Sequence, residues 1–105
     1  MLGRLQVPPA VRKGEPFEIK VLVQHPMETG YRRDLNGQSI PTHIVETLVC
    51  RIAGREVFNA ELGTGIAANP YFAFFAVVDE SGELVVEWGD DRGGKGSLSA
   101  TVNVA

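Results

Sequence analysis

The sequence predicts an all-β protein, an immunoglobulin-like or fibronectin-like antiparallel β-sandwich of about seven strands. Short apolar runs alternate with clusters of Gly, Pro, Asn and Asp, and several runs show the two-residue period of a strand with one buried face. No window of helical length shows a period of 3.6 residues. The length of 105 residues fits one domain, and we place residues 1–105 in it.

Each predicted strand is bounded by turn residues. The clearest predicted strand, residues 17–23, has apolar residues at odd positions and Glu18 and Lys20 between them, which indicates that one of its faces is exposed to solvent. Gly54 and Gly82 mark turns between neighbouring strands, and Gly93 and Gly94 belong to the turn before the last one. The predicted strands, in order, cover residues 3–7, 17–23, 43–52, 56–62, 71–78, 83–88 and 97–104.

The connection over residues 24–42 is the first departure from this pattern. Structureless loops longer than about 12–15 residues are uncommon in compact domains and are often functional. The segment contains Met27 and the charged run Arg32, Arg33 and Asp34. We predict a binding role for it, because loops at the ends of sandwiches commonly bind. The alternative is a flap that covers one end or one sheet of the sandwich.

The strand at residues 71–78 is the second departure, because both of its faces are apolar. Tyr71 begins one face, and Phe72 and Phe74 lie on the other. Only one face of a strand can point into a two-layer core. We predict that Phe72 and Phe74 form an exposed apolar patch that contacts a partner. Coverage of this patch by the long connection is the alternative.

Composition argues against nucleic-acid and membrane functions. The formal net charge is −3, whereas nucleic-acid-binding proteins usually carry a basic excess that neutralises phosphates. No apolar run approaches the ~18 residues of a membrane span. Residues 1–6 lack the continuous apolar core of a secretion signal, so we expect that any export depends on a second protein.

No pair of residues predicts catalysis. Cys50 is the single cysteine, so an intrachain disulfide cannot form. His43 lies in the same predicted strand, about 23 Å away at the usual strand rise, and its side chain points to the opposite face. Because Cys50 shares its face with Leu48 and Ile52, we expect a core thiol and a protein that is not an enzyme. A small redox enzyme that uses Cys50 is the alternative.

The sequence predicts neither a metal nor a cofactor. Two histidines and one cysteine at distant positions lack the spacing of zinc ligands. Asp90 and Asp91 lack the ligand pattern of a calcium loop, so we expect them at a solvated hairpin tip. Residues 63–68 match the dinucleotide fingerprint G-x-G-x-x-A, but that motif requires a following helix, which Pro70 prevents. We therefore interpret these residues as a loop.

Several blocks of the sequence resemble the SoxZ family, the Z subunits of the bacterial Sox thiosulfate-oxidation carrier complex. The similarity extends over nearly the whole chain, and its most specific part is His-Pro-Met-Glu-Thr-Gly at residues 25–30, which strand formation does not require. The other matching residues are Arg32, Arg33, Asp34, Gly37, Ile40, Pro41, Cys50, Gly54, Glu56, Val57, Phe58, Ala68, Asn69, Pro70, Tyr71, Val104 and Ala105.

The resemblance implies a non-catalytic subunit of a sulfur carrier complex. Members of the family are immunoglobulin-like sandwiches that pair with a Y subunit, which holds sulfur intermediates on a cysteine near its C-terminus and carries them among the Sox enzymes. Residues 101–105 of this chain contain no cysteine, so the resemblance implies that Cys50 is not the carrier thiol. It also implies a periplasmic location, reached by co-export with a partner that has the signal.

Both unusual segments are therefore candidate surfaces for the Y subunit or, transiently, for other Sox enzymes. Aromatic anchors usually lie at the centre of an interface and charged residues at its rim. The predicted partner-binding residues are Tyr71, Phe72, Phe74, Met27, Arg32, Arg33 and Asp34. A free-standing adhesion or structural module is the second hypothesis, in which the same apolar strand forms a homodimer.

Overall fold

The computed structural model describes residues 3–63, 66 and 68–105, and its regular structure consists entirely of strands. The strands are β1 (Gly3–Gln6), β2 (Phe17–Val23), β3 (Val45–Ile52), β4 (Arg55–Glu61), β5 (Tyr71–Ala76), β6 (Gly82–Asp90) and β7 (Lys95–Val102). The predicted seven-stranded all-β sandwich is confirmed. Thr64, Gly65 and Ala67 of the glycine-rich run lie outside the described residues. Within the described ranges no helix has the length and apolarity to cross a bilayer.

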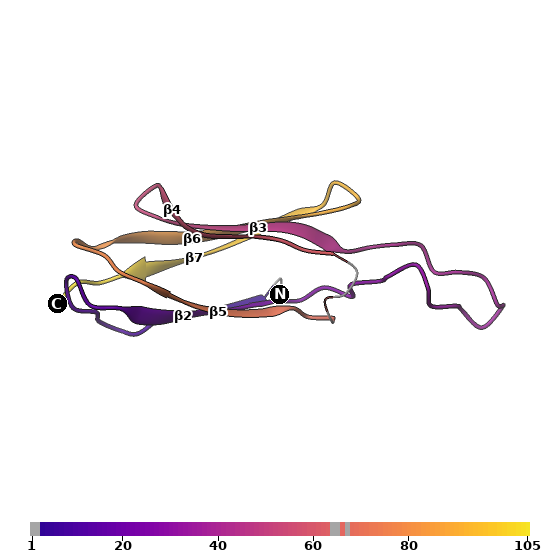
Figure 1. The fold of residues 1–105 in the computed structure, drawn as a ribbon, viewed down its shortest axis with the longest axis horizontal. Coiled ribbons are helices and arrows are strands. Elements are labelled where there is room, and N and C mark those ends of the chain that lie inside the picture. Colours follow the sequence, from indigo (N-terminus) through magenta and orange to yellow (C-terminus); the bar gives the residue numbers. More distant parts are fainter. Residues whose placement is uncertain (1–2, 64–65, 67) are drawn as a thin grey trace.

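The strands form two stacked antiparallel sheets (Figure 1). One sheet has the order β1-β2-β5 and the other has the order β4-β3-β6-β7. The two central strands of the larger sheet, β3 and β6, pair over residues 45–52 and 84–90, with an irregularity between Val45 and Thr47. This non-sequential order is typical of sandwiches in which the chain crosses repeatedly between sheets.

The core lies between the sheets and follows the two-residue period of the strands. All odd positions of β2 are buried, and the even positions are half-buried, as the sequence predicts. Leu84, Val86 and Trp88 of β6 face the same core, and Cys50 of β3 is fully buried beside them. Alternation places apolar side chains on one face of each sheet, and their removal from water is the main driving force for this packing.

The prediction that Phe72 and Phe74 lie on the exposed face of β5 was wrong, because the structure places these two residues on the inward face of the strand. Phe74 is 9% exposed and its ring stacks on Phe58 of β4 at 4.4 Å between centroids. The register with β2 gives the reason, since Phe74 pairs with Ile19 and Phe72 with Val21. Directly paired residues of neighbouring strands share a face, so both phenylalanines point into the core with these aliphatic side chains.

The connection between β2 and β3 is a projecting hairpin, here called the long hairpin (residues 24–44). It extends beyond the end of both sheets (Figure 1), and it contributes to a longest dimension of 57 Å against 22 and 19 Å. Bridges join Glu28 to His43 and Arg33 to Ser39. The segment is therefore paired with itself, and it does not cover the outer face of β5, where Phe75 is 66% exposed.

Candidate functional site

The outer face of β5 is the first candidate site, and we call it the β5 face (Tyr71, Ala73, Phe75 and Val77). Tyr71, Phe75 and Val77 are each more than half exposed. Neighbouring positions on β2 place Lys20 opposite Ala73 and Glu18 opposite Phe75. The predicted excess of apolar side chains in this strand is thus confirmed, with Tyr71 on the exposed side. Two exposed aromatic rings beside an ion-paired margin are typical of interfaces.

The position of β5 in the sheet adds backbone groups to this face. β5 pairs with β2 on one side, and within the described part of the chain no strand pairs with its other side. Phe58 of β4 contacts both Phe72 and Phe74, so the edge strands β4 and β5 lie on the same side of the sandwich. Exposed sheet edges can accept a strand from another chain.

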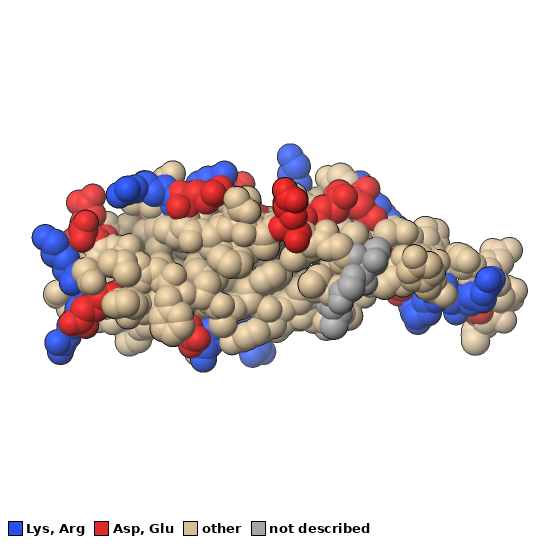
Figure 2. Space-filling view, viewed as in Figure 1, with Lys and Arg blue, Asp and Glu red and all other residues tan. Residues whose placement is uncertain are grey.

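The tip of the long hairpin is the second exposed surface. Tyr31 and Leu35 are 86% and 106% exposed, and the basic side chains on this projection (Figure 2) are arginines, because residues 24–44 contain no lysine. Arg32 forms an ion pair with Glu28, and Arg33 donates a hydrogen bond to the carbonyl of Gly37. Asp34 accepts backbone N–H groups of the tip turn through Oδ1. The charged run is exposed as predicted, and its side chains also shape the turn.

Met27 does not belong to either exposed surface. It is 4% exposed and lies at the base of the long hairpin, where the backbone N–H of Val45 points at its Sδ at 3.2 Å. Its positive φ of 49° turns the chain from β2 into the hairpin. The prediction that Met27 is available to a partner was therefore wrong, because the residue is part of the core.

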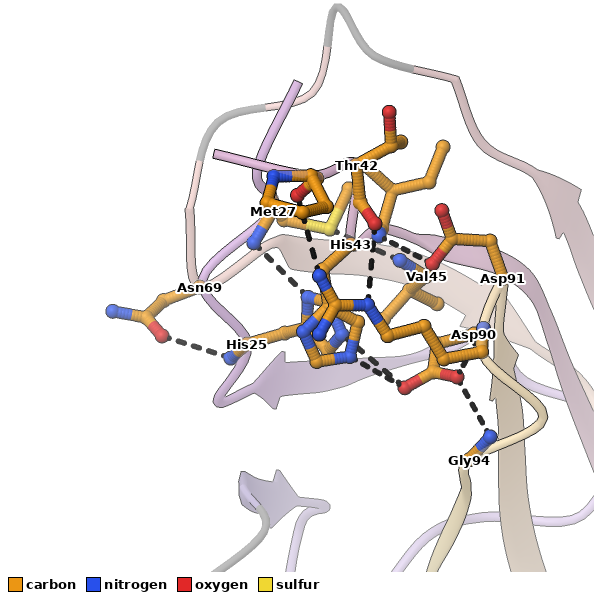
Figure 3. Close-up of polar contacts among 12 residues, drawn as sticks. His25, Met27, Thr42, His43, Val45, Asn69, Asp90, Asp91 and Gly94 are labelled. Carbon is orange, nitrogen blue, oxygen red and sulfur yellow. Dashed lines mark hydrogen bonds and ion pairs between the residues drawn. The ribbon is translucent and has the colours of Figure 1, made fainter. Parts of the chain in front are cut away.

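A cluster of polar side chains at the base of the long hairpin is the third candidate, and we call it the His-His-Asp cluster (His25, His43 and Asp90; Figure 3). His25 follows β2, His43 precedes β3 and Asp90 ends β6. One ring nitrogen of each histidine and a carboxylate oxygen of Asp90 all lie within 4.8 Å of one another. The fold thus gathers three chemically active groups from three separate segments.

Asp90 is held in place by the turn that follows it. Its Oδ1 accepts the backbone N–H groups of Arg92 and Gly94 at 2.9 and 2.7 Å, and its Oδ2 accepts a hydrogen bond from His43 Nε2 at 2.9 Å. The His43 hydrogen bond is the main reason that the pKa of Asp90 falls to about 2. Only 13% of its side chain is exposed, so the predicted solvated tip was wrong for Asp90, although Asp91 is exposed.

His25 is the most buried member, with 8% of its side chain exposed. Burial, followed by the nearby His43, lowers the pKa of His25 below its ordinary value of 6.5. The backbone N–H of Met27 donates to its Nδ1 at 3.0 Å, which leaves the proton of the neutral ring on Nε2. That Nε2 lies 3.6 Å from Asp90 Oδ2, too far for a direct hydrogen bond, and it has no hydrogen-bond partner among the described residues.

The surrounding backbone fixes the cluster. Asn69 and His25 exchange two hydrogen bonds, from His25 N–H to Asn69 Oδ1 and from Asn69 N–H to the His25 carbonyl. Asp91 similarly pairs with Ile44 through its backbone N–H and its Oδ1. The guanidinium of Arg92 donates to the carbonyls of residues 41 and 42. Hydrogen bonds from the β6–β7 turn therefore hold the second half of the long hairpin in place.

Sequence reasoning missed the His-His-Asp cluster because its members are far apart in the chain. His25 and His43 are separated by the whole long hairpin, and Asp90 lies 47 residues beyond His43 at the end of β6, which pairs with β3. Local ligand spacing, which identifies most metal motifs in a sequence, carries no signal here. The cluster is created by tertiary pairing, such as the bridge between Glu28 and His43 that brings the two ends of the hairpin together.

Comparison with known families shows to which family the chain belongs. The profile of the family described as sulphur oxidation protein SoxZ matches residues 5–101. The chain belongs to the SoxZ family. This confirms the resemblance stated from the sequence and makes the protein a subunit of the Sox sulfur-oxidation system. No curated protein matches the sequence.

Solved structures support the fold. Superoxide reductase (neelaredoxin) from Ignicoccus hospitalis is 18% identical at a TM-score of 0.72, covering 100% of this chain and 81% of that one. A putative superoxide reductase from Thermotoga maritima is 18% identical at 0.73, covering 98% and 85%. The sulfur carrier protein SoxY from Chlorobium limicola f thiosulfatophilum is 12% identical at 0.68, covering 100% and 80%. At these identities the likeness concerns architecture alone.

Proposed function

We propose that this SoxZ chain is the non-catalytic half of a sulfur carrier complex and binds a Y-type subunit through its β5 face. The observation that carries the proposal is the group of exposed apolar side chains on an edge strand, Tyr71, Phe75 and Val77. Exposed apolar patches on the surface of a domain commonly mark the site where a partner binds. Family membership supplies the class of that partner.

The chemistry of the β5 face fits a protein partner. Aromatic side chains anchor interfaces when they enter a desolvated pocket, and a charged rim excludes water around them. Glu18 and Lys20 lie on the same outward side of the sheet and pair at 3.6 Å. A specific interface buries about 800 Å² per partner, so contacts must extend from β5 toward the neighbouring edge strand β4 and toward β2.

The proposal is tested by changing one exposed apolar side chain on each of the two surfaces. Phe75→Asp places a charge at the centre of the β5 face, and Leu35→Asp makes the same kind of change at the tip of the long hairpin. Binding to the Y subunit is measured by titration calorimetry, with circular dichroism as the folding check. We expect Phe75→Asp to weaken binding at least 100-fold and Leu35→Asp to change it less than threefold. The reverse pattern would move the Y interface to the hairpin.

The homodimer hypothesis uses the same face. If the strand pairs with its own copy, the chain alone forms a two-fold dimer, and Phe75→Asp converts it to a monomer. Light scattering on the isolated chain, with and without the Y subunit, distinguishes the two. A monomer alone and a one-to-one complex with the Y subunit support the carrier function.

Burial of the only thiol supports the non-enzymatic part of the proposal. Burial raises the pKa of Cys50 to about 12, so little thiolate forms at neutral pH, and the thiolate is the reactive species. We expect Cys50 to react with a thiol reagent at least 100-fold more slowly in the native protein than in denaturant. Equal rates would revive a redox role for Cys50.

We also propose that the protein works in the periplasm and is exported together with its Y subunit. The support is the family resemblance, in which the Y subunit has the export signal. Fractionation of cells that express the chain with and without its Y subunit tests this directly. Release of the chain from the periplasm only when the Y subunit is present is the expected outcome, and an unchanged cytoplasmic fraction contradicts it.

A further inference from the structure

The His-His-Asp cluster has a donor set that the proposed carrier function does not use. Imidazole nitrogen and carboxylate oxygen are ligands that Zn²⁺ and related divalent transition metals accept together. Zn²⁺ binds such atoms at about 2.0–2.1 Å, so two ligand atoms in a tetrahedral site lie about 3.3–3.4 Å apart. The two separations from Asp90 Oδ2, 2.9 Å to His43 and 3.6 Å to His25, bracket that value.

The unpartnered Nε2 of His25 is an independent observation that points to a ligand. Buried polar atoms are almost always hydrogen-bonded, and exceptions commonly mark a missing ion or water. His25 Nε2 is fully buried and has no hydrogen-bond partner in the part of the chain that the structure describes. It is directed toward the same Asp90 oxygen that His43 contacts (Figure 3). His43 is the most accessible member, with 26% of its side chain exposed, and gives the cluster an opening to solvent.

The carboxylate of Asp90 is already oriented for such a ligand. Its Oδ1 is occupied by the two backbone N–H groups of the β6–β7 turn, so only Oδ2 is directed at the histidines. A carboxylate held by hydrogen bonds on its other oxygen is the usual outer-shell arrangement in metal sites. The site therefore requires little reorganisation at Asp90.

We propose that His25 Nε2, His43 Nε2 and Asp90 Oδ2 bind one divalent transition-metal ion of the Zn²⁺ type at the base of the long hairpin. Three protein ligands leave at least one coordination position for water or for a group from a partner. The proposal does not depend on how the chain binds its Y subunit, because the β5 face and the His-His-Asp cluster share no residue.

Metal binding has a specific structural consequence at Met27. In the metal-free chain the Met27 N–H donates to His25 Nδ1, which keeps the ring proton on Nε2. A metal at Nε2 moves that proton to Nδ1, where it faces the Met27 N–H, and the two donors cannot remain in contact. Binding must therefore loosen this hydrogen bond, and the His43 proton on Nε2 must leave or move to Nδ1 in the same step.

The test uses the untagged full-length chain, because a histidine tag would bind the same ions. Zn²⁺ is titrated by calorimetry after treatment with a chelator, and amide spectra are recorded by NMR with and without Zn²⁺. We expect one Zn²⁺ per chain, a dissociation constant of about 10 μM or tighter, and a shifted Met27 amide signal. Absence of binding, or binding with an unchanged Met27 signal, overturns the proposal.

Adjacent aspartates supply a matched pair of variants. Asp90→Asn and Asp91→Asn remove the same charge and keep an oxygen acceptor for the backbone, but only Asp90 belongs to the site. We expect Asp90→Asn to weaken Zn²⁺ binding at least tenfold and Asp91→Asn to weaken it less than threefold. If both variants lose the same affinity for Zn²⁺, the ion is bound by the general negative charge of this region, and the proposal is wrong. His43→Gln, at a partly exposed position, should also weaken Zn²⁺ binding at least tenfold, and thermal melts check that each variant is folded.

Discussion

Phe74 and Phe75 show that a shift of one position along a strand decides whether a side chain is buried in the core or exposed on the surface. They are consecutive residues with the same side chain, but Phe74 is 9% exposed against Phe58 and Phe75 is 66% exposed on the β5 face. Successive side chains of a strand point to opposite sides of the sheet. One ring therefore contributes to folding, and the other is available to a partner.

Alanine substitutions at these two positions should separate stability from binding. Phe74→Ala removes a stacked core ring and leaves a cavity, so we expect the free energy of unfolding to fall by about 3–5 kcal/mol. Phe75→Ala removes an exposed ring and should change it by less than about 0.5 kcal/mol. Urea denaturation of both variants measures the difference. Similar losses in the two would mean that the β5 face is packed in solution.

The sequence predicted the seven strands and most of the core, because turn residues and a two-residue period are local signals. It predicted the buried face of β2 from Glu18 and Lys20, and the burial of Cys50 from its neighbours. It could not orient β5, since both faces are apolar and only the pairing of Phe74 with Ile19 decides between them. The His-His-Asp cluster escaped prediction for a related reason, because tertiary pairing creates it.

At the scale of elements, the β6–β7 turn and the long hairpin act as one unit. Asp90, Asp91 and Arg92 reach from the turn to residues of the hairpin base through side-chain hydrogen bonds. Hydrogen bonds to charged groups contribute more than neutral ones. The direction in which the hairpin projects is therefore set by the ionised carboxylate of Asp90 together with a largely neutral His25.

This arrangement predicts that acid destabilises the metal-free protein in two steps. The pKa of His25 is below its ordinary 6.5 in the fold, so the unfolded chain binds more protons and stability falls as the pH drops below that value. The pKa of Asp90 is about 2 against an ordinary 3.8, so its contribution is complete above 3.8 and is lost as the pH falls toward 2.

Urea denaturation in the presence of a chelator at pH 7, 5 and 3 measures both steps. Asp90→Asn reduces the second step but does not remove it, because the hydrogen bond from Arg32 also lowers the pKa of Glu28. Asp91→Asn serves as the variant with the same charge change. A flat stability profile between pH 7 and pH 3 in the unchanged protein would contradict both pKa shifts.

At the scale of the whole molecule, the protein combines a sandwich with a projection that adds little to its core. Residues 31–39 of the long hairpin are all exposed, whereas its base carries the buried Met27 and His25. The bridge between Glu28 and His43 marks the boundary between the two parts. The tip and the β5 face are thus two separate exposed surfaces of the molecule.

Removal of the tip should leave the fold intact. Replacement of residues 31–40 by Asn-Gly, a sequence that favours a tight hairpin turn, deletes the exposed residues 31–39, the partly buried Ile40 and the surface ion pair of Arg32 with Glu28. Exposed ion pairs contribute about 0–1 kcal/mol, and a shorter loop costs less entropy to close. We therefore expect the free energy of unfolding to change by less than about 1 kcal/mol in urea denaturation.

If the β5 face forms the Y interface, the shortened chain keeps its affinity for the Y subunit, whereas contacts that depend on Arg32, Arg33 and Asp34 are lost. A loss of stability above about 3 kcal/mol would show that the tip folds back onto the sandwich in solution and would remove it from the candidate surfaces.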